Sequence, residues 1–223
     1  MDASNLIQSI LIYALPVLFA ITVHEAAHGY VARHFGDNTA LMMGRITLNP
    51  IKHIDPIGTI LMPLLLYFST SGAFLFGYAK PVPVNFSNLR NPKRDMIWVA
   101  LAGPMVNFIM AILWAVLLLL LLGFGVNERF FLAMAKAGVS VNLVMWAFNL
   151  FPLPPLDGGR VLTGLLPWKQ AHWLARLEPY GFFIVMGLVL MGVVSTLWLQ
   201  PLMSVGYSII NVLMIPLRAL LLG

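Results

Sequence analysis

Apolar residues along this chain form long runs with few charges, instead of the alternation typical of a strand exposed on one face. The runs cover residues 6–31, 57–76, 96–124, 137–151, 181–199 and 202–222. About 20 apolar residues are enough for a helix to cross the hydrocarbon core of a bilayer. The pattern therefore predicts an all-α integral membrane protein, a bundle of about five to six transmembrane helices.

The run at 57–76 is the irregular one. A Ser-Thr-Ser-Gly sequence at 69–72 interrupts it, and Pro81 and Pro83 follow among β-branched residues. Prolines are tolerated in sheets only at an edge. We therefore expect a short membrane-embedded re-entrant or β-hairpin segment, with its return leg at 73–85. Such backbone survives at membrane depth only where protein covers it or where it lines a wet cavity.

The composition supports a membrane location. Apolar residues make up 60% of the 223 residues and charged residues 9%, with a mean hydropathy of +0.89, whereas soluble proteins carry about 25% charged residues. We expect a single membrane-embedded domain over 1–223, with a core at about 6–160 and a C-terminal helical hairpin at about 178–222. The sequence has no cysteine, so a metal would need His, Asp, Glu or Asn as ligands.

The basic residues predict the orientation in the membrane. They are scattered over the predicted loops, and a nucleic-acid partner is not expected because it would need them on one face. Loops rich in Lys and Arg stay in the cytoplasm. Only Arg129 and Lys136 then lie outside, together with the N-terminus, and both ends of the 57–76 segment face the cytoplasm. The cytoplasmic set is Arg33, Arg45, Lys52, Lys80, Arg90, Lys93, Arg94, Arg160, Lys169, Arg176 and Arg218.

An H-E-x-x-H motif, formed by His24, Glu25 and His28, lies inside the first apolar run. On a helix the two histidines share one face and can bind a single Zn²⁺, while Glu25 can take a proton from water during hydrolysis. Ionisable groups in the lipid core are costly and are functional candidates by default. The alternative is that the histidines are only hydrogen-bonded within the bundle.

A catalytic zinc ion usually has three protein ligands. Asp157 follows the fourth run, at the same expected depth as His24 and His28, and is our candidate for the third ligand. The alternative is that Asp157 caps a helix beginning at Gly158, as many Asp-Gly pairs do.

These residues resemble the site-2 protease family of intramembrane zinc metalloproteases. H-E-x-x-H at 24–28 and N-x-x-P-x-P-x-L-D-G at 149–158 match at every specified position, and 102–107 is similar to the A-G-P-x-x-N element of that family. The resemblance implies that His24, His28 and Asp157 bind one Zn²⁺, that Glu25 is the catalytic base, and that peptide bonds are hydrolysed within or beside the membrane. The chain is similar to the compact subgroup without PDZ or CBS domains.

Three further residues are candidates for auxiliary or substrate-binding roles. His53, in the loop after the first run, could be an extra zinc ligand in a resting state or a donor to the oxyanion, or else a solvated loop residue. Asn107 and Asn149 could bind the backbone of a substrate or orient the site, or else form interhelical hydrogen bonds.

The expected function is hydrolysis of membrane-protein substrates in or near their transmembrane segments, that is, regulated intramembrane proteolysis. An extended substrate could pair with an edge strand near 79–85. The alternative is a zinc-binding or zinc-transporting membrane protein without peptidase activity, which has no use for Glu25; a silent relative that binds without cutting is disfavoured for the same reason. We expect a prokaryotic plasma membrane with the site toward the cytoplasm, and a homo-oligomer is left open.

Overall fold

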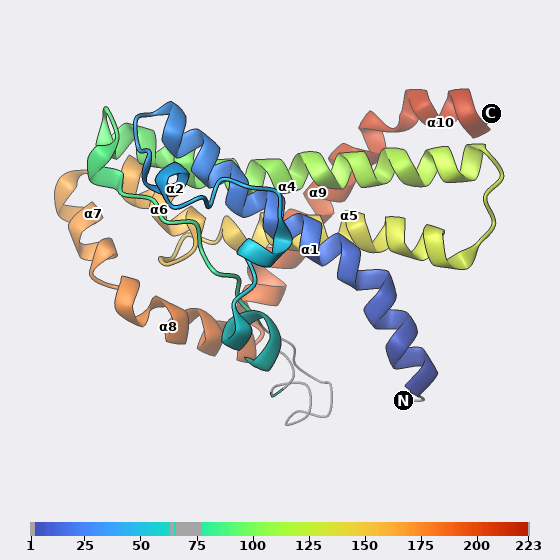
Figure 1. Ribbon diagram of the computed structural model, residues 1–223, viewed down its shortest axis with the longest axis horizontal. Helices are drawn as coiled ribbons and strands as arrows, with labels where there is room; N and C mark the ends of the chain where they lie inside the picture. Colours follow the sequence, from blue (N-terminus) through green and yellow to red (C-terminus); the bar gives the residue numbers. More distant parts are fainter. Residues whose placement is uncertain (1–2, 63–64, 66–76, 223) are drawn as a thin grey trace.

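Three long helices form the centre of the protein (Figure 1). The computed structural model describes residues 3–62, 65 and 77–222. Helix α1 covers Ala3–His34, α4 covers Pro92–Gly123 and α5 covers Arg129–Asn149. All three are long and apolar enough to cross a membrane, and each packs against the other two. This agrees with the predicted all-α membrane fold.

Small residues allow these helices to approach closely. Ala111 and Ala115 of α4 are buried in a cluster with Leu143 of α5. A Cβ atom at Gly138 would lie 2.1 Å from the ring of Trp114, so only glycine fits there. Because lipid is as apolar as these side chains, close packing of this kind is what holds membrane helices together.

The connection from α1 to α4 begins and ends at the same end of the helix pair. The backbone N–H of Arg90 donates to the carbonyl of Phe35 at 3.0 Å. Between them lie α2 (Thr39–Met42), a 3₁₀ helix (Pro50–Lys52), a π-helix (Pro56–Leu61) and a second 3₁₀ helix (Phe86–Asn88). The chain between them therefore cannot be a simple single crossing.

The expected re-entrant or β-hairpin segment at 57–76 falls largely on residues 63–64 and 66–76, which lie outside the described part of the chain. Its return leg is extended at 77–85, but no β-strand occurs among the described residues. Isolated backbone hydrogen bonds hold this leg: Tyr78 donates to Gly58 at 3.0 Å and Lys80 to His53 at 3.0 Å. Pro81 and Pro83 lack the N–H groups that a regular ladder would need.

The C-terminal part is a series of short helices. They are α6 (Asp157–Leu165), α7 (Trp168–Ala175), α8 (Glu178–Leu190), a π-helix (Ser195–Leu199), α9 (Gln200–Leu213) and α10 (Ile215–Leu222). The gap between the apolar runs at 181–199 and 202–222 is not a helix break, because the helix continues through Gln200 and Pro201. The break lies at Gly192, whose φ of 75° is left-handed and is readily adopted only by glycine.

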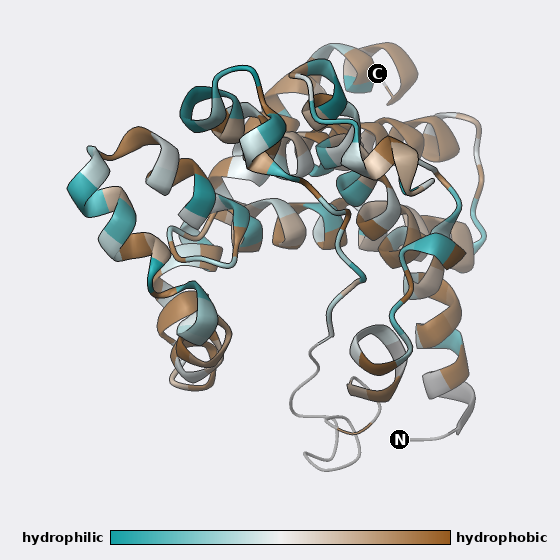
Figure 2. Cartoon of the chain, turned by 60° about the vertical axis from the view of Figure 1, so that its left-hand side comes forward, coloured by the Kyte–Doolittle hydropathy of each residue, from teal (hydrophilic) through white to brown (hydrophobic). Residues whose placement is uncertain are grey.

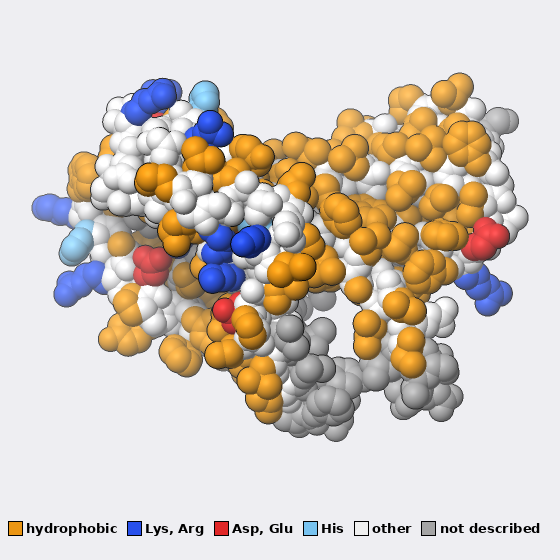
Figure 3. Space-filling view, in the orientation of Figure 1, with side chains coloured by type: hydrophobic (Ala, Val, Ile, Leu, Met, Phe, Trp, Pro, Cys, Tyr) orange, Lys and Arg blue, Asp and Glu red, His pale blue; other side chains and the backbone are white. Residues whose placement is uncertain are grey.

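Helix α10 ends beside the C-terminal end of α4. A Cβ atom at Gly123 would lie 3.0 Å from Leu221, and a bend of 51° separates α9 from α10. The helix that carries Arg218 thus lies at the opposite end of α4 from Arg90, which differs from the placement inferred from charge. In Figure 3 most Lys and Arg side chains gather toward the end that holds α2 and α7.

The described helices include three candidate spans, or five if the bent pairs α7–α8 and Ser195–Leu222 each count as one. The predicted count of five to six spans is therefore reached only at its lower limit of five, and only if each bent pair forms one span. Figure 2 shows apolar residues along the long helices and hydrophilic residues mainly in their connections, as a lipid-facing surface requires.

Candidate metal centre

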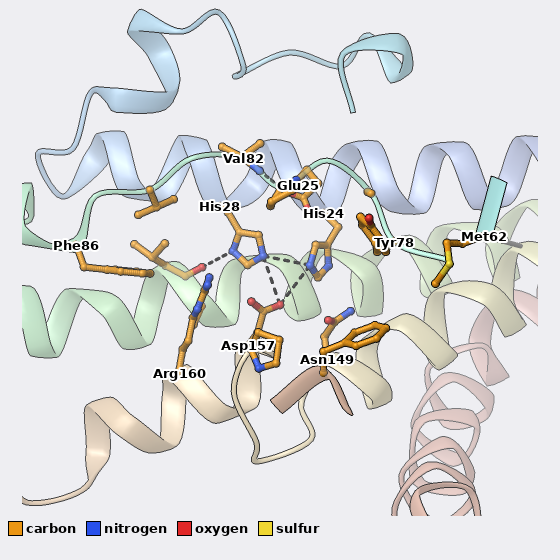
Figure 4. Close-up of a pocket in the computed structure, with 17 residues that line it drawn as sticks. His24, Glu25, His28, Met62, Tyr78, Val82, Phe86, Asn149, Asp157 and Arg160 are labelled. Atoms are coloured by element: carbon orange, nitrogen blue, oxygen red, sulfur yellow. Dashed lines mark hydrogen bonds and ion pairs between the residues drawn. The ribbon is translucent and has the colours of Figure 1, made fainter. Parts of the chain in front are cut away.

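Two helices bring three potential metal ligands to one point. His24 and His28 project from α1, and Asp157 is the first residue of α6. The Nε2 atoms of His24 and His28 lie 3.2 and 3.4 Å from Oδ2 of Asp157 and 3.1 Å from each other. Figure 4 shows the three side chains converging. Within the described part of the chain, no other group of His, Asp and Glu is placed to hold a metal.

Each imidazole is anchored through its other ring nitrogen. Nδ1 of His28 lies 2.7 Å from the carbonyl oxygen of Val99, which can only accept, so this nitrogen donates. Nδ1 of His24 lies 2.6 Å from Oδ1 of Asn107. The amide nitrogen of Asn107 donates to the carbonyl of Ala20 at 3.2 Å, which turns its oxygen toward His24. When neutral, both rings therefore carry hydrogen on Nδ1 and a lone pair on Nε2.

Three lone pairs consequently face one another. Oδ2 of Asp157 is buried and accepts no hydrogen bond from the described residues, and an unpaired buried carboxylate is costly. Ligand atoms about 2.0–2.2 Å from a tetrahedral zinc ion lie roughly 3.3 Å apart, close to the separations found here. Two imidazoles and one carboxylate also form a common catalytic zinc set with an open fourth position. The residues present fit a zinc ion.

A glycine on α4 makes room for both imidazoles. A Cβ atom at Gly103 would lie 2.5 Å from Cε1 of His24 and 2.5 Å from Nε2 of His28. Real Cβ contacts are not this short, so any side chain at this position would displace the rings.

Two more glycines place Asp157. A Cβ atom at Gly158 would lie 2.1 Å from the carbonyl oxygen of Leu150, and one at Gly159 would lie 2.1 Å from the nitrogen of Pro154. Both clashes are with backbone, which cannot move aside as a flexible side chain can. The Asp-Gly-Gly sequence therefore allows the Pro-rich turn after α5 to fold against the start of α6.

Glu25 lies beside the histidines and is held by the extended segment at 77–85, called the extended leg below. Its Oε2 accepts a hydrogen bond from the N–H of Val82 at 2.7 Å, as Figure 4 shows. The guanidinium of Arg45 fixes this leg from the other side by donating to the carbonyls of Lys80 and Pro81 at 2.9 and 3.2 Å. One carboxylate oxygen is thus committed to the backbone, and Oε1 makes no hydrogen bond to the described residues.

A cavity of about 640 Å³ opens beside this group. Apolar side chains from the extended leg, α4 and α8 form much of its wall, and the polar lining residues are His24, Glu25, His28, Asn149, Asp157 and Arg160. A mostly apolar cavity with a few convergent polar groups is the usual form of a binding site.

The other candidates from the sequence lie in different places. Asn107 is fully buried behind His24. Asn149 lines the cavity, with its amide nitrogen donating to the carbonyl of Met145 at 3.0 Å. Asp157 makes no side-chain cap of α6.

His53 does not join the metal-ligand group: its side chain is 1% exposed, and Nε2 lies 2.9 Å from the carbonyl oxygen of Thr47. It is not a solvated loop residue either.

Sequence reasoning missed several residues that build the site. Val82 acts through its backbone, which no side-chain pattern reveals. Asn142 is fully buried and accepts a hydrogen bond from Asn107 at 3.0 Å; an amide in an apolar helix, one turn from Gly138, was the available signal. Gly103 belongs to the A-G-P-x-x-N element at 102–107, but only tertiary packing shows its contact with the imidazoles. Arg160 was assigned to a loop and lines the cavity.

Comparisons with known proteins agree with this geometry. Residues 12–139 match Peptidase family M50. YwhC of Bacillus subtilis (strain 168), named as a candidate zinc metalloprotease, is 38% identical over 202 residues, covering 86% of this chain and 85% of its own. Rip2 of Mycolicibacterium smegmatis, named likewise, is 30% identical over 175 residues, covering 78% of this chain and 64% of its own. No solved structure matches the chain.

A more distant archaeal relative has the same kind of name. The zinc metalloprotease MJ0392 of Methanocaldococcus jannaschii is 27% identical over 153 residues, which cover 69% of this chain and 34% of its own. The family match spans more than half of the chain, and the matched residues include the H-E-x-x-H motif and all of α4. The chain therefore belongs to Peptidase family M50, the site-2 protease family of membrane zinc metalloproteases.

Proposed function

We propose that this protein is an intramembrane protease that hydrolyses peptide bonds in or near transmembrane segments of membrane proteins, as in regulated intramembrane proteolysis. One observation carries the proposal: two imidazole lone pairs and an unpartnered carboxylate oxygen converge beside Glu25, in a cavity between apolar helices. A structural ion-pair network would not need three lone pairs aimed at one point.

His24, His28 and Asp157 would hold the zinc ion. Zinc in such a site acts as a Lewis acid and makes water acidic enough to attack near neutral pH. Asn107 and the carbonyl of Val99 orient the imidazoles through Nδ1, a support that typically strengthens metal binding.

Glu25 is the proposed general base. Its Oε1 is available to take the proton of the attacking water, while Val82 holds Oε2 in place. The same carboxyl group then returns the proton to the nitrogen of the leaving amine. This assigns the base to a residue that is adjacent to a ligand but is not itself a ligand.

The extended leg is the proposed binding surface for the substrate backbone. A helix in lipid hides its peptide bonds, so the substrate must unwind before water can attack. The Val84 N–H and the Val82 carbonyl make no hydrogen bond to the described residues, and both residues line the cavity. An unwound segment could pair with these groups even though the leg has no regular strand partner.

The orientation stays a proposal drawn from charge. Ten basic residues lie near the His34 end of α1, in the connection to α4, in the first turn of α4, or in and directly after α6 and α7. Arg129 and Lys136 follow the far end of α4, and Arg218 lies in α10 beside that end. From this bias we infer that the metal centre faces the cytoplasm of a prokaryotic plasma membrane and that the N-terminus is outside.

Metal removal tests the proposed activity. The purified protein is incubated in detergent with a panel of tagged single-span membrane proteins, before and after treatment with a chelator. We expect cleavage of at least one panel member, its loss on chelation, and recovery on addition of Zn²⁺. Stoichiometric zinc without cleavage of any panel member would favour the zinc-binding or transport alternative instead.

A further inference from the structure

We propose that Arg160 forms a subsite that selects substrates with an Asp or Glu beside the apolar segment and rejects those with Lys or Arg there. The inference rests on the proposed function and adds a substrate class to it. Among the described residues that line the cavity, Arg160 is the one Lys or Arg side chain. The proposed chemistry does not use it.

Helix geometry fixes Arg160 relative to the metal centre. Asp157 and Arg160 are three residues apart in α6, so their side chains leave the helix on the same face. The glycine contacts that seat the start of α6 against the Pro-rich turn fix both. Figure 4 shows the Arg160 side chain directed into the cavity, between Phe86 and the imidazole of His28.

Two contacts orient the guanidinium without using all of its donors. Its Cζ lies 5.5 Å from the ring centre of Phe86, and Nη2 lies 3.4 Å from Oε1 of Glu178. Nε and Nη1 have no acceptor among the described residues, although a guanidinium has five N–H donors in a fixed fork. The side chains of Arg160 and Glu178 are 37% and 48% exposed, so this single long ion pair is weak and can yield to another carboxylate.

The two ends of the cavity differ in character. The extended leg runs along it from Tyr78 to Phe86, past the metal centre (Figure 4). Met62 and Tyr78 line one end, whereas Phe86 and Arg160 line the other. A bound segment would therefore place its apolar part toward Met62 and the adjoining polar flank toward Arg160.

The cation at this end has a consequence for selectivity. Cytoplasmic flanks of transmembrane segments are usually rich in Lys and Arg. With the metal centre facing the cytoplasm, Arg160 would repel this common flank and attract the rarer acidic one. Discrimination of this kind comes as much from the repulsion of wrong partners as from the attraction of the right one.

Model peptides provide the test. Each has an apolar span of Leu and Ala, an Asn-Gly pair to permit unwinding, and a flank in which Asp, Asn or Lys occupies successive positions in turn. Cleavage is measured with the zinc-loaded protein in neutral phosphatidylcholine vesicles, and peptide affinity with the Glu25→Gln variant. At one or two adjacent positions we expect Asp to exceed Lys by about fivefold in both rate and affinity, the scale of a partly exposed ion pair.

Charge reversal identifies the residue responsible. Arg160→Glu should invert the order of Asp and Lys at those same positions, and Arg160→Gln should remove the preference. Arg176→Glu is the matched control, because it makes the same charge change on an exposed residue outside the cavity lining, and it should leave the preference intact.

The contrary outcomes are distinct. Equal cleavage of Asp and Lys peptides at every position overturns the Arg160 subsite and leaves the protease proposal standing. A uniform loss of cleavage in both Arg160 variants, with no change in preference, also overturns the subsite. So does a dependence on anionic phosphatidylglycerol that replaces the dependence on the flank, since Arg160 would then bind lipid. If the wild type cleaves no peptide, the proposed function and this inference both fail.

Discussion

The imidazoles of His24 and His28 depend on a residue that has no side chain. Gly103 lies where a Cβ atom would come within 2.5 Å of both rings. The ring nitrogens that face away from the metal centre are held by Asn107 and by the carbonyl of Val99. The metal centre is thus shaped from α4 as well as from the helices that carry the ligands.

We expect Gly103→Ala to weaken zinc binding by about tenfold or more, because displaced imidazoles no longer converge with Asp157. Zinc content after dialysis against a competing chelator measures this. Gly187→Ala is the control, since nothing lies within 4 Å of a Cβ there and replacing a helical glycine by alanine is neutral or stabilising. Equal zinc retention in both variants would show that the contact with Gly103 is not restrictive.

Much of the metal centre could be predicted at this scale. The spacing of His24, Glu25 and His28, and the sequence around Asp157, suggested residues that the structure places together. Of the three roles left open for Asn107, its contacts match two: it orients His24 and forms interhelical hydrogen bonds. Val82 could not be found, because its contribution is a backbone N–H whose position depends on the fold of a distant segment. His53 is an ionisable residue in a loop near the motif, which made it a candidate, but its ring nitrogen contacts the carbonyl of Thr47.

At the scale of elements, hydrogen bonds to the Asp37 carboxylate connect the extended leg to the turn that follows α1. The carboxylate of Asp37 accepts hydrogen bonds from the N–H and hydroxyl of Thr39 at 3.0 and 2.5 Å, and from the N–H of Asn85 at 2.8 Å. It also accepts from the side chain of Asn88 at 3.1 Å. Asp37 therefore fixes the far end of the leg that holds Glu25.

The stabilisation that these hydrogen bonds provide should depend on pH. Burial alone raises the pKa of the Asp37 carboxyl, but the hydrogen bonds from Thr39, Asn85 and Asn88 outweigh it and hold the pKa below its ordinary value. The stabilisation is then complete above the unfolded pKa of about 3.9 and is lost as the pH falls through the lower folded value. We expect amide exchange at 85–89, relative to intrinsic rates, to accelerate only below about pH 4.

Asp37→Asn should show faster exchange at 85–89 already at neutral pH, because a neutral amide accepts these hydrogen bonds less well. Glu128→Gln, an exposed change beyond α4, serves as the control. Protection at 85–89 that is the same in the wild type and Asp37→Asn would rule out this role for Asp37.

Long apolar runs predicted the long helices well and the C-terminal helices poorly. The run at 96–124 lies almost wholly within α4, but α5 begins at Arg129, eight residues before its run at 137, since charged residues need not end a helix. Pro201 did not break the helix, because the wide π-turn of Ser195–Leu199 before it can accommodate a residue that lacks an N–H. Gly192 supplied the real break.

For the whole molecule, the connection between α1 and α4 determines at which end of the long helices each later segment lies. The hydrogen bond between Arg90 and Phe35 joins the two ends of that connection, so α1 and α4 run in opposite directions. This arrangement brings Asp157 to the depth of His28 and closes the three-residue group. Charge counting predicted this relation, but it misplaced Arg218, because the helix break at Gly192 and the bend between α9 and α10 are not encoded by charge.

Single cysteines in this cysteine-free chain can test the arrangement. Cysteines at Lys52 and Arg90 should be labelled only from the cytoplasmic side, and cysteines at Glu128 and Arg218 only from outside. The first pair lies in the connection after α1, and the second pair lies at or beside the far end of α4. Labelling of position 218 together with position 90 would contradict the packing of α10 against Gly123. Labelling of position 90 from the side opposite to position 52 would contradict the closed metal centre.

We propose that a zinc ion held by His24, His28 and Asp157 would act together with Glu25 to cleave membrane proteins. The most direct measurement is zinc content and cleavage rate, side by side, in purified wild type, Glu25→Gln and the control Glu128→Gln. We predict one zinc per chain in all three proteins, with cleavage lowered at least about a hundredfold in Glu25→Gln alone. Wild-type cleavage by Glu25→Gln with zinc still bound would contradict the account.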